Sequence, residues 1–77
     1  MPEDREHTVN EIKTILVALG YEARIDPDPS GRLFSCTIEK EGVAKMNSPQ
    51  EGTKFHALMA SLNRLIEFLE HKAYPVK

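Results

Sequence analysis

The residue types that carry most enzymatic and metal chemistry are sparse in this sequence. The three histidines, His7, His56 and His71, do not share the i, i+4 spacing that places two imidazoles on one helix face. Cys36 is the single cysteine, and apolar alternation around it predicts a core-facing side chain, where a thiol is unreactive. We therefore expect no catalytic residues, no metal site and no cofactor, so the protein is interpreted as a non-enzyme.

One loop begins like a calcium-binding loop. The stretch from Asp26 to Gly31 places oxygen donors at alternate positions and a glycine at the sixth. The twelfth position is Thr37, where a bidentate glutamate is needed, and the flanking residues have the alternation of strands instead of helices. The pattern therefore favours a proline-rich connection between two strands.

Length and composition indicate one small domain in a reducing compartment. The chain has 77 residues, is 40% hydrophobic and carries a net charge of −2, which gives no pointer to nucleic acid. A single cysteine cannot form an internal disulfide, which favours a cytoplasmic, intracellular setting. The charged N-terminus is unlike a signal peptide, and no apolar run approaches the roughly 20 residues of a membrane span.

Periodicity predicts a helix, three strands and a second helix. A Thr8–Glu11 capping box and the terminating Gly20 predict a helix over residues 9–19. Alternating residues predict strands at 21–26, 34–39 and 43–47. A three-residue loop over 40–42 would pair Ile38 with Ala44.

A capping box at Ser48–Glu51 predicts a second helix over residues 49–72, long enough to overhang its own domain. Large apolar residues recur on one stripe of this helix: Phe55, Leu58, Met59, Leu62, Leu65, Ile66, Leu69 and Ala73. The fold class is therefore an α+β two-layer sandwich, α-β-β-β-α, with both helices on one face of a three-stranded antiparallel sheet. We expect a disordered N-terminus over 1–7, a single domain over 8–73 and a C-terminal tail over 74–77.

The back of the second helix is a candidate partner-binding patch. An aromatic and an arginine framed by small residues can anchor a partner, because small side chains allow close approach. The predicted patch comprises Ala57, Ser61, Arg64, Phe68, His71 and Lys72. The open face of the sheet is a second surface that could bind a partner.

The order of elements resembles the double-stranded-RNA-binding domain. In that family the start of the last helix grips phosphates, and the first helix contacts a minor groove. The resemblance implies nucleic-acid contacts from Lys54 and His56 in the matching stretch 49–56, together with Lys13. That stretch also contains Glu51, and the loop over 26–32 holds two acids and one base, whereas a polyanion is held by several cations.

The leading hypothesis is therefore a small protein–protein interaction module, a regulator or inhibitor that docks on a partner protein or complex. Small chains without recognisable chemistry are common in phages and mobile elements, where they block host defence complexes such as a CRISPR effector. A homodimer through the second helix belongs to the same hypothesis. The alternative is a double-stranded-RNA or other nucleic-acid binding domain, and no membrane association is expected.

Overall fold

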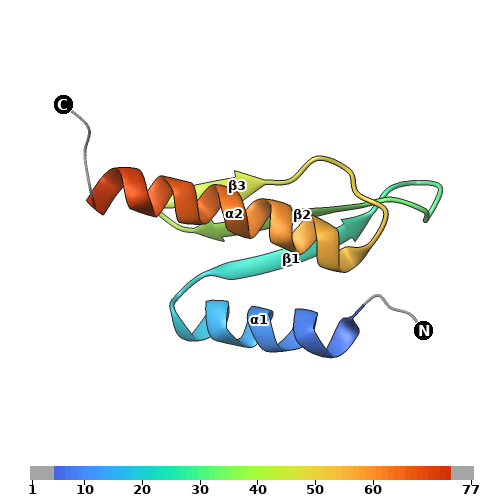
Figure 1. Cartoon of the computed structure of the whole chain (residues 1–77), viewed down its shortest axis with the longest axis horizontal. Helices are drawn as coiled ribbons and strands as arrows, with labels where there is room; N and C mark the ends of the chain where they lie inside the picture. The colour runs from blue at the N-terminus through green and yellow to red at the C-terminus, as the bar shows by residue number, and fades with distance from the viewer. Residues whose placement is uncertain (1–4, 74–77) are drawn as a thin grey trace.

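Two helices and a three-stranded sheet make up the computed structural model, which describes residues 5–73 (Figure 1). The elements are α1 (Glu6–Ala18), β1 (Glu22–Pro27), β2 (Phe34–Lys40), β3 (Ala44–Asn47) and α2 (Lys54–Ala73). The sheet is antiparallel with the order β1-β2-β3, and both helices pack on one of its faces. The predicted α-β-β-β-α fold class is confirmed.

The helix-facing side of the sheet is the predicted one. Ile38 lies opposite Ala23 on β1 and opposite Met46 on β3, and all three contribute to the core. The predicted pairing of Ile38 with Ala44 is wrong, because Lys40 takes that place. The three-residue loop is 41–43 instead of 40–42, and a shift of two residues in the pairing leaves the same residues on each face.

Helix α1 ends as predicted but begins earlier. Gly20 adopts a left-handed φ of 91°, and its N–H donates to the Val17 carbonyl at 3.0 Å. The Tyr21 N–H donates to the Leu16 carbonyl at 2.8 Å, which completes a Schellman motif. At the other end the helix begins at Glu6 after Arg5, so Thr8 is not its cap.

Residues 6 and 7, from the stretch 1–7 that was expected to be disordered, belong to α1. Residues 1–4 and the predicted tail over 74–77 lie outside the described part of the chain.

The predicted start of the second helix is also wrong. The Ser48 N–H donates to the Cys36 carbonyl at 2.9 Å, and Ser48 Oγ accepts the Cys36 N–H at 2.8 Å. Phe34 and Glu51 exchange two backbone hydrogen bonds of 2.8 Å. Because β3 is short, residues 48–51 supply the partners that the β2 backbone needs. Helix α2 begins at Lys54, and Thr53 caps it by accepting the His56 N–H at 3.0 Å.

Helix α2 presents a different face to the sheet from the predicted one. Its buried residues are Ala57, Leu58, Ser61 and Leu65, and Phe68 packs against the same core. At 100° per residue, the core-facing direction lies about a quarter of a turn from the centre of the stripe of large apolar residues. Small residues at 57 and 61 let the helix approach β2 closely, and Ser61 Oγ donates to the Cys36 carbonyl at 2.6 Å.

Candidate functional site

The predicted partner-binding patch does not form one exposed surface. Ala57 and Ser61 are fully buried, and Phe68 packs against the core, so the prediction that these three residues face outward is wrong. Arg64 and His71 are exposed. Lys72 lies in the last turn of α2, and its side chain is outside the described part of the structure. The correction has one cause, the rotation of α2 that brings its small residues against β2.

Large apolar side chains of both helices are exposed to solvent. On α2, Ile66 is 44% exposed and Leu69 is 40% exposed. On α1, Ile15 is 59% exposed, and Leu19, which caps its C-terminal end, is also 59% exposed. Two side chains one turn apart on each helix therefore present apolar surface that the fold does not use.

These four residues lie on the facing edges of two neighbouring helices. Helices α1 and α2 are in contact and run in the same direction across the sheet (Figure 1). The Arg5 guanidinium, just before α1, lies 4.8 Å from the centre of the Phe55 ring, which identifies the edge of α2 that faces α1.

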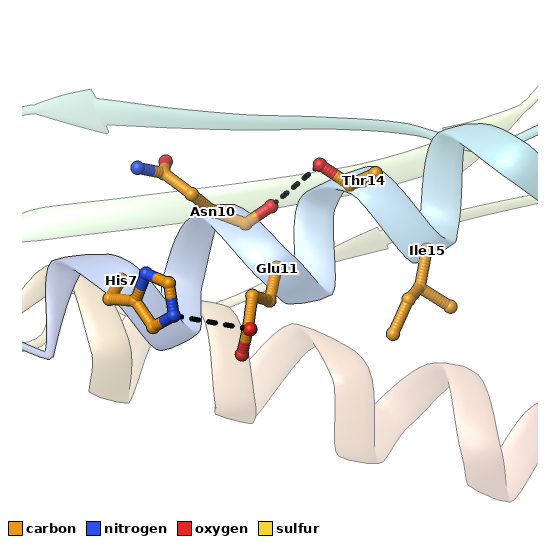
Figure 2. A pocket seen from close by; sticks show the side chains of 5 residues that line it. All are labelled: His7, Asn10, Glu11, Thr14 and Ile15. Atoms are coloured by element: carbon orange, nitrogen blue, oxygen red, sulfur yellow. Dashed lines mark hydrogen bonds and ion pairs between the residues drawn. The ribbon is translucent and has the colours of Figure 1, made fainter.

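Leu62, Ile66 and Leu69 continue the edge that Phe55 begins, because residues three, four and seven apart share a helix side. Ile15 points from α1 toward α2 (Figure 2), and Leu19 follows it by one turn. We call Ile15, Leu19, Ile66 and Leu69 the interhelical surface.

Charged groups of both signs lie beside the interhelical surface. Glu11 lies one turn before Ile15 and borders a shallow open depression on α1 (Figure 2). Its carboxylate is 3.2 Å from His7 Nε2. Glu70 lies one turn after Ile66 and is exposed. The last turn of α1 contains no basic residue.

Lys40 is a basic residue beside the end of α1, and its ammonium group contacts two groups there. It donates to the Leu19 carbonyl at 3.3 Å and lies 5.2 Å from the centre of the Tyr21 ring. Because α1 and α2 are parallel, the partial negative charges of both C-terminal ends point the same way. Acidic and basic side chains therefore both border the interhelical surface.

The residues that the RNA resemblance singled out are only partly brought together. Lys54 and His56 lie in the first turn of α2, where a small hollow is lined by Arg5, Thr53, Phe55 and His56. Lys54 Nζ lies 5.9 Å from the Phe34 ring centre, and His56 Nδ1 lies 3.0 Å from Thr53 Oγ1. Lys13 is on α1, about 12 Å along the helix axis from Arg5.

Arg5 is the additional base in this region that sequence reasoning missed. Residues 1–7 were expected to be disordered, whereas Arg5 is placed by its carbonyl, which accepts the Val9 N–H at 3.0 Å, and by its contact with Phe55.

The open face of the sheet is occupied by polar groups that bind one another. Arg24 Nε donates to Asp26 at 3.3 Å, and Thr37 Oγ1 donates to Asn47 Oδ1 at 2.9 Å. Glu22 lies directly opposite Glu39 in the β1–β2 pairing. No large exposed apolar side chain lies on this face of the described strands, so it offers less to a protein partner than the helix layer.

The loop after β1 is held as a turn. Asp28 Oδ1 accepts the Ser30 hydroxyl at 2.8 Å and the Leu33 N–H at 3.3 Å, and the bond from Ser30 is the main cause of a lowered Asp28 pKa. Asp26 is engaged by Arg24. Within residues 5–73, no three His, Cys, Asp or Glu side chains are placed to hold a metal ion together. Burial raises the pKa of the Cys36 thiol, which lies in the core.

Comparison with models of protein families, with curated proteins and with solved structures returned no match. In the part of the chain that the structure describes, neither helix is long and apolar enough to cross a bilayer. The geometry of the helix layer is therefore the evidence that bears on the function.

Proposed function

We propose that this protein is a non-enzymatic interaction module, a regulator or inhibitor that docks on a partner protein through the interhelical surface. The carrying observation is the exposure of Ile15, Leu19, Ile66 and Leu69 on adjoining edges of two helices. Exposed large apolar side chains gathered on one surface are typical of protein interaction sites. Docking would bury them and block whatever the covered surface of the partner does.

The cost of keeping these residues exposed supports the proposal. The core is small, and several partly buried residues surround it, so apolar side chains would stabilise the fold if they were buried. The buried side of α2 combines the small residues Ala57 and Ser61 with two leucines, whereas Ile66 and Leu69 remain on its solvent-facing edge. A partner that covers this edge gives the large residues a role that folding does not.

A capture experiment with the full-length chain tests the proposal. The tagged protein is incubated with lysate of its native cell, one half of which is treated with nuclease, and bound proteins are identified by mass spectrometry. We expect a partner that is retained in both halves and lost with Ile66→Gln/Leu69→Gln. Arg64→Gln/His71→Gln, on the opposite side of α2, is the matched control and should retain it. Retention by the first variant with loss by the control would assign docking to Arg64 and His71 instead.

Nucleic-acid binding is the second candidate function. It is supported by the order of the elements and by the position of Arg5, Lys54 and His56 around the start of α2. Binding of this kind depends steeply on salt, because each neutralised phosphate releases counterions. A labelled RNA duplex that shifts in low salt, and loses the shift with Arg5→Gln/Lys54→Gln, would support it. The absence of any shift in low salt would dismiss it.

A further inference from the structure

We draw no further inference here: the strongest candidate, the exposed apolar surface on the facing edges of α1 and α2, carries nothing beyond the proposed docking function, because charged groups of both signs border it and nothing in the structure shows what covers it.

Discussion

Ser61 is a hydroxyl in the middle of the core, where α2 crosses β2. A buried hydroxyl is costly unless it is hydrogen-bonded, and Ser61 Oγ donates to the Cys36 carbonyl at 2.6 Å. The same carbonyl also accepts the Ser48 N–H, so it holds together the helix, the central strand and the segment after β3. The rotation of α2 therefore depends on a small residue that can both fit and donate.

Substitutions of Ser61 test whether this position needs both a small side chain and a hydrogen-bond donor. Ser61→Ala should cost about 1 kcal/mol of unfolding free energy, because the Cys36 carbonyl keeps its bond from Ser48. Ser61→Leu should cost more, about 1–3 kcal/mol or above, because it forces the helix away from the sheet. Urea denaturation measures both, with Ser35→Ala on the opposite face of the sheet as the control. Equal stability of Ser61→Leu and the wild type would contradict the close approach.

Asp28 offers a test of the loop that resembles a calcium site. Its pKa lies below the ordinary value chiefly because the Ser30 hydroxyl donates to the carboxylate. A lowered pKa in the folded state gives stability that is present above the ordinary pKa of the carboxyl and is lost as pH falls through the folded value. Ser30→Ala should raise the pKa of Asp28 and reduce this acid-dependent part of the stability.

Carboxyl NMR titration of Asp28 in the two proteins measures the shift directly. Ser35→Ala is again the matched control and should leave the pKa of Asp28 unchanged. An Asp28 that titrates at the same pH with and without the Ser30 hydroxyl would show that the turn is held by other groups.

At the scale of elements, two capping motifs match the sequence pattern equally well, and neither marks the start of a helix. Thr8–Glu11 and Ser48–Glu51 both match the pattern, yet α1 begins before Thr8 and Ser48 pairs with β2. Capping is a local signal, whereas the need of the β2 backbone for partners beyond a short β3 is a tertiary one. Gly20 was predictable because a left-handed C-terminal cap depends on the glycine itself.

Alanine substitutions of Thr53 and Thr8 test which of the two threonines caps a helix. Thr53→Ala should cost about 1 kcal/mol, because Thr53 Oγ1 accepts the His56 N–H at the start of α2. Thr8→Ala should cost little or stabilise slightly, because Thr8 lies inside α1, where alanine is the better helix former. Chemical denaturation of the two variants gives the comparison, and an equal loss in both would contradict the observed helix starts.

The face that α2 buries could not be predicted from apolar residues alone. The sheet alternates with a period of two, so its buried face followed from the sequence without ambiguity. The helix has large apolar residues on one edge and small residues beside them, so two rotations were open. The distance between helix and sheet decided between them, and that distance depends on Cys36, Ala57 and Ser61 together.

At the scale of the whole molecule, the unused apolar edge of α2 extends beyond the sheet. The molecule measures 44 × 23 × 23 Å, and α2 projects past the sheet and past α1 at its C-terminal end (Figure 1). The expectation that this helix overhangs its domain is therefore confirmed. The proposed docking function connects the overhang with the exposed apolar residues of the two helices.

Substitutions at three neighbouring positions on α2 distinguish effects on folding from effects on docking. Leu65 is 3% exposed, so Leu65→Ala should cost about 2–5 kcal/mol of unfolding free energy. Ile66→Gln and Leu69→Gln remove side chains that are 44% and 40% exposed, so each should cost at most about 1 kcal/mol. Urea denaturation gives these values, and capture of the partner is measured at a temperature where all variants are folded.

The core variant and the two surface variants should have opposite effects on stability and on partner binding. Leu65→Ala should bind the partner normally once it is folded, whereas Ile66→Gln and Leu69→Gln should be nearly as stable as the wild type and bind poorly. If Ile66→Gln instead destabilised the protein as much as Leu65→Ala, Ile66 would belong to the core, and the interhelical surface would not be free to dock. The position of α2 on the sheet would then have to be closer to the one that the apolar stripe alone predicts.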